Sequence, residues 1–252
     1  MKKKRRLKKS VLYVLLIFFI CLFVASIVGV VSWINDHNGY MDIKSELDTY
    51  VTVTTETTEE GEEKEVLLVD FEKLKELNND TVAFLYVNGT NINYPIVQTD
   101  NNDFYLNHTF NKNKNDAGWV FMDYRNKLDG KDKNIIMYGH NRIDGIMFGS
   151  LKKTLEADWY NNPDNLKVQL ITEEGINYYQ VFSVYKIRAE DYYIRTEFDN
   201  NFKVFLDNIA SRSVHNFDVP LEEDDQIITL STCVGFTDTR LVLHAKLIKD
   251  TE

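Results

Sequence analysis

The stretch that decides the fold is IITLSTCVGFTDTRLVLHAKL, residues 227–247. Two runs rich in aliphatic and β-branched residues, 227–233 and 240–247, are joined by the six residues VGFTDT. Such runs on either side of a short connection are typical of an antiparallel hairpin. Directly opposed side chains in a hairpin have Cβ atoms about 4.5–5.5 Å apart. The pattern therefore predicts that Cys233 and Arg240, at the two facing strand ends, share one end of a sheet.

Similar short segments recur along the chain and are separated by clusters of Asn, Asp and Gly. With the hairpin they give eight predicted strands, at residues 82–87, 92–97, 118–124, 134–138, 165–171, 178–187, 226–231 and 240–248. About eight strands with few helices between them predict a mainly β fold, a closed or nearly closed and mainly antiparallel barrel.

Two helices are predicted beside these strands. The first precedes the strands and carries apolar residues at helical spacing, Leu67, Phe71, Leu74 and Leu77. The second is an insertion before the strand that ends at Cys233. Its apolar stripe follows the i, i+4, i+7, i+8, i+11 pattern of an amphipathic helix that faces a core, at Phe198, Phe202, Phe205, Leu206 and Ile209.

The N-terminus has the pattern of a membrane anchor. Residues 1–10 carry seven Lys or Arg and no acid, and residues 11–31 carry no charge. A spanning helix needs about 20 apolar residues, whereas the core of a cleaved signal peptide has about 7–15 and precedes a small-x-small site. Since no clean site follows, we expect an uncleaved anchor with a cytoplasmic basic tail and the rest of the chain outside.

Beyond the anchor, residues 32–65 are rich in Thr and Glu and are interpreted as a solvated stalk or a loosely held helix, which leaves 66–252 as the main domain. The whole chain has a formal net charge of −10, although its N-terminus is strongly basic. The part outside the membrane is therefore acidic. This excludes a nucleic-acid-binding protein, which would carry a basic face on its folded part.

The chain has two cysteines, Cys21 in the apolar run and Cys233 in the hairpin, so we expect no disulfide in the outer domain. A lone thiol there is either an apolar filler or a reactive group. Beside Arg240, a reactive Cys233 would suit nucleophilic acyl transfer, because a guanidinium can stabilise an oxyanion or hold substrate carbonyls. The sequence pattern leaves both interpretations open.

Acyl transfer also needs a group that moves protons, and the chain has five histidines. His140 follows NIIMYG, so a strand should deliver it to a loop at one end of the sheet, where catalytic groups are commonly found. His37 lies beside the membrane, His215 lies in a polar connection, and His108 has no strand directly before it. His244 lies inside a strand and is expected to have a structural role.

These residues together resemble the sortase family. TLSTC (229–233) and TRLVLHAKL (239–247) resemble the active-site hairpin of sortases, and YGHN (138–141) resembles the strand end that carries their catalytic histidine. The resemblance continues through 78–107, 118–126 and 145–153, and covers about residues 66–249. The long helical segment before the nucleophile strand is similar to that of class B.

The resemblance implies that Cys233 is the nucleophile, His140 the general acid and base, and Arg240 the oxyanion or substrate clamp. It also implies a groove for a sorting peptide at Asn102, Leu106, Tyr193, Ile194, Ser231 and Thr232. The VGFTDT connection looks shorter than in some class B sortases. Asp238 within it could orient His140, although a solvated acid is the preferred interpretation.

The implied reaction cleaves a sorting motif after its Thr through a thioacyl intermediate, which an amine of the peptidoglycan cross-bridge or a pilin lysine resolves. We expect no metal or other cofactor, because the sequence has no EF-hand loop and no Cys/His ligand cluster. A cysteine peptidase and a non-catalytic anchored receptor remain alternatives. An L,D-transpeptidase is disfavoured by the seven-residue spacing between Cys233 and Arg240.

Overall fold

The structure is a computed structural model that describes residues 8–57, 63–233 and 238–249 of the 252-residue chain. It divides into two units, residues 1–44 and 45–252. Most of the first unit is helix α1 (Lys9–Asp48), whose most apolar window has a mean hydropathy of 3.2. This helix is long and apolar enough to cross a membrane. A signal sequence near the N-terminus can have the same length and composition. It contains the predicted span 11–31, whereas residues 1–7 of the basic tail lie outside the described residues.

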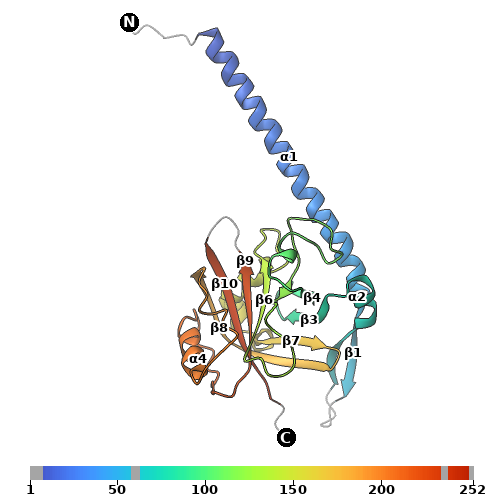
Figure 1. The fold of residues 1–252 in the computed structure, drawn as a ribbon, viewed down its shortest axis with the longest axis vertical. Helices are drawn as coiled ribbons and strands as arrows, with labels where there is room; N and C mark the ends of the chain where they lie inside the picture. Colours follow the sequence, from blue (N-terminus) through green and yellow to red (C-terminus); the bar gives the residue numbers. More distant parts are fainter. Residues whose placement is uncertain (1–7, 58–62, 234–237, 250–252) are drawn as a thin grey trace. The chain divides into compact units, whose positions relative to one another are not determined.

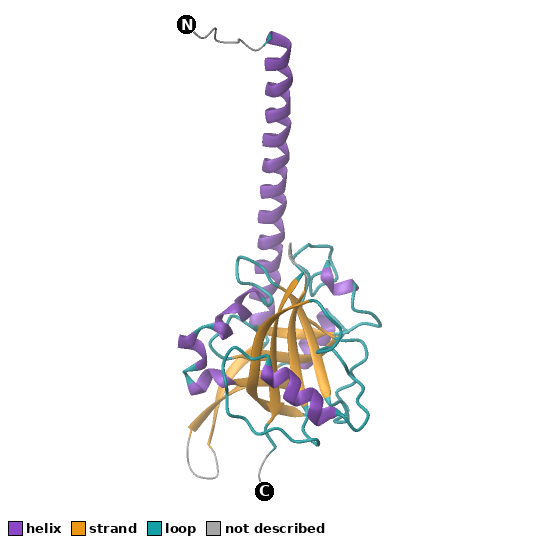
Figure 2. Cartoon of the chain, turned by 90° about the vertical axis from the view of Figure 1, so that its left-hand side faces the viewer, coloured by secondary structure: helices purple, strands orange, loops and turns teal. Residues whose placement is uncertain are grey.

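The second unit contains the predicted eight-stranded closed barrel (Figure 1), in which strands are hydrogen-bonded in the order β10-β8-β7-β3-β4-β5-β6-β9. Its strands are β3 (Thr81–Val87), β4 (Asn93–Val97), β5 (Phe121–Met122), β6 (Asn134–His140), β7 (Lys167–Thr172), β8 (Gly175–Arg188), β9 (Ile227–Cys233) and β10 (Thr239–Leu247). Each lies in or overlaps one predicted segment. Figure 2 shows these strands at the centre of the unit, with the shorter helices on the outside.

The barrel is mainly antiparallel, as predicted, but it includes two parallel pairs, β4 with β5 and β6 with β9. The second pair runs in continuous register from Asn134 opposite Ile227 to His140 opposite Cys233. Parallel neighbours require a long crossover connection, and here it contains β7, β8 and helix α4 (Phe202–Ser211). Because both strands run in the same direction, their C-terminal residues meet at the same end of the barrel.

The segment interpreted as a stalk or a loosely held helix contains both helix and strands: residues 32–48 continue α1, and two strands follow. β1 (Val51–Thr57) and β2 (Glu63–Val69) form an antiparallel pair, with residues 58–62 outside the described part. Thr and Val favour strands, so the composition that looked merely soluble also suits a two-stranded sheet. Leu67, assigned to a helix from its spacing, lies in β2. Helix α2 (Phe71–Leu77) begins after Asp70, whose side chain caps it by accepting a hydrogen bond from the Lys73 amide.

The predicted helical insertion is confirmed as α4, which packs beside β8 (Figure 1). Phe202, Phe205, Leu206 and Ile209 on it are buried. Phe198 precedes the helix, and its ring centroid lies 4.6 Å from that of Phe202 and 4.7 Å from that of Phe205. The apolar stripe therefore faces a core, as the sequence pattern indicated.

His244 lies in the barrel interior and is fully buried, in agreement with its expected structural role. Its Nδ1–H donates to Thr229 Oγ1 at 2.8 Å, and Thr229 donates in turn to Asn134 Oδ1 at 2.6 Å. The Tyr185 hydroxyl donates to His244 Nε2 at 2.9 Å. Both ring nitrogens thus have partners that suit the neutral imidazole.

Burial, aided by the positive charge of Arg212, lowers the pKa of His244 from 6.5 to about 3. The folded protein therefore binds this proton less readily than the unfolded chain, and its stability should fall as the pH drops from about 6.5 towards 3. The loss should approach about 1.4 kcal/mol per pH unit for one proton. His244→Gln should lose less stability over that range. Unfolding of the full-length chain in detergent between about pH 4 and 7 measures the two slopes, and equal slopes would contradict this assignment.

Candidate active site

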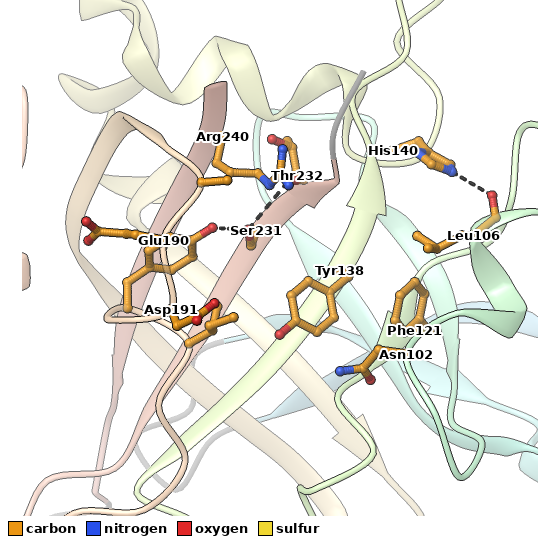
Figure 3. A pocket seen from close by; sticks show the side chains of 13 residues that line it. Asn102, Leu106, Phe121, Tyr138, His140, Glu190, Asp191, Ser231, Thr232 and Arg240 are labelled. Carbon is orange, nitrogen blue, oxygen red and sulfur yellow. Dashed lines mark hydrogen bonds between the residues drawn. The ribbon is translucent and has the colours of Figure 1, made fainter. Parts of the chain in front are cut away.

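A cleft of about 490 Å³ opens where β6 and β9 end (Figure 3). Its walls come from the connection after β4, from β5 and β6, from the connection between β8 and α4, and from β9 and β10. The side chains that line it are Asn102, Leu106, Phe121, Tyr138, His140, Ala189, Glu190, Asp191, Tyr193, Ile194, Ser231, Thr232 and Arg240. The fold thus gathers at one site residues from segments that are far apart in sequence.

Position 233 lies on the strand between the other two predicted catalytic positions. In the parallel β6–β9 pair, His140 and Cys233 are Cα partners. On the other side of β9, β10 is antiparallel, with Val242 opposite Ser231. If this antiparallel register continues for two more residues towards the connection, Arg240 lies opposite Cys233, as the sequence predicted for the hairpin.

His140 is held by the protein backbone. Its Nε2 lies 2.6 Å from the carbonyl oxygen of Leu106, in the short 3-10 helix η1 (Phe104–Leu106). A carbonyl can only accept, so this nitrogen carries a proton and donates it along the contact drawn in Figure 3. Behind the strand, the ring of Phe148 packs so closely on Gly139 that a Cβ there would lie 2.8 Å from it. The imidazole is therefore oriented by its carbonyl partner, and its strand is fixed by close packing.

Arg240 supplies an unused donor at the cleft. Its Nη1 is buried and has no hydrogen-bond partner among the residues that the structure describes. A buried donor without a partner is costly, and such groups commonly mark a functional site. The adjacent backbone is fixed, because the Leu241 amide donates to Thr232 Oγ1 at 2.9 Å. The guanidinium is thus available to a substrate oxygen.

The structure brings the six predicted substrate positions into this same cleft. The hydroxyls of Tyr193 and Ser231 are 3.1 Å apart, and this contact links the β8–α4 connection to β9. Asp238, the proposed alternative partner of His140, is exposed, and its carbonyl accepts a hydrogen bond from the Ala189 amide at 2.8 Å. Residues 234–237, most of the VGFTDT connection, lie outside the described residues.

Five residues of the cleft were not predicted from the sequence: Phe121, Tyr138, Ala189, Glu190 and Asp191. Tyr138 could have been found, because residues two apart on a strand face the same side and His140 was already a candidate. The acids at 190 and 191 gave no such signal, since exposed Glu and Asp are common in connections.

Comparisons with known proteins agree with this geometry. The family model described as Sortase domain matches residues 85–248. Sortase B of Listeria monocytogenes is 36% identical over 257 residues, with 98% of this chain and 99% of that protein covered. Sortase B of Staphylococcus aureus is 39% identical over 184 residues, with 71% and 75% covered. A solved S. aureus sortase B–substrate complex has a TM-score of 0.67 and 38% identity, with 72% of this chain and 85% of that chain covered.

The chain belongs to the sortase family of cysteine transpeptidases. The curated relatives that it matches are named sortase B, so the class inferred from the helical insertion is supported as well.

The support for His140 can be tested at Gly118. This residue has φ +62°, and a Cβ there would lie 2.6 Å from the Tyr105 carbonyl oxygen, 2.8 Å from that of Leu106 and 3.0 Å from His140 Cδ2. Gly118→Ala should therefore displace the carbonyl that accepts from His140 and shift the NMR signal of the His140 Nε2–H proton, which spectra of the full-length chain in detergent measure.

Gly130→Ala is a matched control, because Gly130 has φ +74° and a Cβ added to it would meet no atom within 4 Å. Both variants should lose about 1 kcal/mol of stability from left-handed backbone strain. An unchanged His140 Nε2–H signal in Gly118→Ala, or the same change in both variants, would contradict the prediction.

Proposed function

We propose that this protein cleaves a sorting motif after its Thr and transfers the N-terminal part to an amine of the peptidoglycan cross-bridge. Cys233 is the nucleophile, His140 the general acid and base, and Arg240 the oxyanion or substrate clamp. The observation that carries the proposal is the strand order β6-β9-β10, which sets position 233 between the strands of His140 and Arg240. The extracellular domain is residues 66–252, to which the β1–β2 pair adds a folded segment.

The reaction has two acyl-transfer steps. The Cys233 thiolate attacks the Thr carbonyl carbon, and the Arg240 Nη1–H donates to the oxyanion that develops there. The bond between this carbon and the following nitrogen breaks as His140 protonates the leaving amine, which leaves a thioester on Cys233. The incoming amine then attacks the thioester, gives its proton to His140 and releases the thiolate.

The substrate occupies the cleft formed by Asn102, Leu106, Tyr193, Ile194, Ser231 and Thr232. The cleft supports an extended peptide because its lining is mixed, with apolar side chains beside hydroxyl and amide groups that can orient a backbone. A similar protein, S. aureus sortase B, has been solved in complex with a substrate. The partners that the proposal assigns to this cleft are exported proteins with a C-terminal sorting motif.

Two alternatives differ in the fate of the acyl group. In a pilus-assembling sortase the acceptor is a pilin lysine, and in a cysteine peptidase the acceptor is water. Transfer to a cross-bridge amine is favoured because the chain is similar to sortase B of L. monocytogenes over nearly its whole length. A non-catalytic receptor is disfavoured because the chain belongs to the sortase family of transpeptidases.

The protein is proposed to be anchored through residues 11–31 with the basic tail 1–10 in the cytoplasm and the catalytic unit outside the cell. Protease added to intact cells stripped of their wall should digest the second unit and spare the anchor. Complete protection of the second unit, or a mature protein that begins near Ser32, would overturn this topology.

The thioester gives the most direct test of the mechanism. The full-length chain in detergent is incubated with candidate peptides that carry a Pro-x-Thr core, and mass spectrometry locates adducts by peptide mapping, which separates Cys233 from Cys21. We expect an adduct on Cys233 that moves to an added amine and that hydroxylamine releases as a hydroxamate. Cys233→Ala should abolish both products, and His140→Ala should severely slow their formation.

Arg240→Lys in the same assay tests the guanidinium. Lysine keeps the charge but offers a compact ammonium in place of a planar fork of N–H donors. The acylation rate should fall by roughly 10²–10³, the usual cost of losing one oxyanion donor. Turnover that persists in Cys233→Ala would end the proposal, and a normal rate in Arg240→Lys would remove Arg240 from it.

A further inference from the structure

Asp123 lies directly behind the cleft wall without lining the cleft. It follows β5 and is fully buried. Both of its carboxylate oxygens accept hydrogen bonds. Oδ1 accepts from the Arg125 amide at 3.0 Å and from Arg125 Nε at 2.8 Å, and Oδ2 accepts from Arg125 Nη2 at 2.7 Å. Arg125 thus grips the carboxylate with a fork of two N–H groups.

Two residues of the cleft bind the same carboxylate. The Tyr138 hydroxyl donates to Asp123 Oδ2 at 2.9 Å, and Asn102 Nδ2 donates to the same oxygen at 3.0 Å. Asn102 Oδ1 accepts from the Tyr124 amide at 3.1 Å, which fixes the orientation of the amide group. Figure 3 shows Tyr138 and Asn102 lying near each other in the cleft. They come from β6 and from the connection after β4, and Asp123 ties them together.

Arg125 extends this connection to a third wall. Its Nη2 also donates to the carbonyl of Ile194 at 3.0 Å, in the connection between β8 and α4. The two neighbouring carbonyls, of Tyr193 and Arg195, accept from Asn134 Nδ2 at 3.3 and 2.9 Å. Three consecutive carbonyls of this wall are therefore held by side chains from the barrel.

Asp123 stays charged in this setting. Burial acts to raise the pKa of its carboxyl, but the hydrogen bonds from Arg125 and Tyr138 together outweigh burial and hold that pKa below its usual value. Burial raises the pKa of Tyr138, so its hydroxyl keeps the proton that it donates. The side chains of Arg125, Tyr138 and Asn102 all donate to the carboxylate, and an acceptor with two oxygens is the group that satisfies them.

We propose that Asp123 is a positioning residue for substrate binding, because one buried carboxylate sets the relative places of Asn102, Tyr138 and the Ile194 wall. It touches no reacting atom and acts through Asn102 and Tyr138 directly and, through Arg125, on the Ile194 wall. As a substrate-binding role, the inference rests on the proposed function. Asparagine at position 123 would have nearly the same size as the aspartate. Its NH₂ group would replace one acceptor oxygen and would face the N–H and O–H groups that now donate to the carboxylate.

The test is steady-state kinetics of the full-length chain in detergent with a Pro-x-Thr peptide and an amine. Asp123→Asn should raise KM by about tenfold to a hundredfold, the effect of losing a hydrogen bond to a charged group. The value of kcat should change by less than about twofold, since uniform binding is what is lost. Tyr138→Phe, which removes one donor and keeps the charge, should raise KM less and provides a milder variant if Asp123→Asn does not fold.

Asp225→Asn is the matched control. Asp225 is also buried, at 2% exposure, and its Oδ2 accepts from the Glu222 amide at 2.7 Å and pairs with Lys246 Nζ at 3.0 Å. It precedes β9, whereas Cys233 ends that strand, so it lies at the opposite end of the barrel from the cleft. Asp225→Asn should lower the melting temperature and leave KM unchanged.

A second readout does not depend on turnover. Amide hydrogen exchange over residues 189–195 should speed up in Asp123→Asn and stay at the wild-type rate in Asp225→Asn. If wild-type protein turns over no peptide, the proposed function fails, and the exchange rates still decide whether Asp123 fixes the wall. A folded Asp123→Asn with normal KM and normal exchange would overturn the inference, as would a loss confined to kcat.

Discussion

The parallel pairing of β6 with β9 is the constraint on which the site depends. Both strands end at the same edge of the barrel, and their register sets His140 beside Cys233. Antiparallel pairing at this point would send the two residues to opposite ends. Since β10 returns antiparallel along the far side of β9, Arg240 also comes to this edge. The backbone ladder, which a single substitution can hardly shift, therefore fixes the three positions.

Around this edge, polar groups are held by partners that have no catalytic role. A backbone carbonyl orients His140. Beside Arg240, the next backbone amide donates to a threonine hydroxyl. A buried carboxylate binds two residues of the cleft. A peptide cleft needs walls that keep their places before substrate arrives, because ordering them on binding would cost affinity. The charged and amide groups under this cleft provide that order at the expense of burying the Asp123 carboxylate, whose desolvation its hydrogen bonds offset.

Much of the fold could be predicted from the sequence because each barrel strand is a compact run of β-branched and aromatic residues between turn-forming clusters. Local patterns were weaker guides where two structures suit the same residues. Leu67 has helical spacing with Phe71, yet it belongs to β2, because the cap at Asp70 starts the helix later. The Thr-rich stretch 51–57 has few apolar residues to bury but pairs through its backbone with 63–69.

The sequence predicted those site residues whose chemistry depends on one residue type within a short motif, namely Cys233, His140 and Arg240. Strand pairing between segments distant in sequence left no local signal, so the parallel contact that sets His140 beside position 233 was missed. Asp123 was missed for a related reason. Its partners at 102, 138 and 194 meet only in the folded barrel, and an aspartate after a short strand looks like an ordinary loop acid.

The β6–β9 pair also has a consequence for how the protein is made. Its partners are separated by 93 residues of sequence, from Asn134 with Ile227 to His140 with Cys233. Contacts of such long range form slowly, because the entropy of closing a large loop must be offset before they contribute stability. The strand that carries the thiol is also synthesised after the strand that carries His140. A growing chain therefore has a histidine without its neighbouring strand, and the reactive arrangement forms only when the barrel closes.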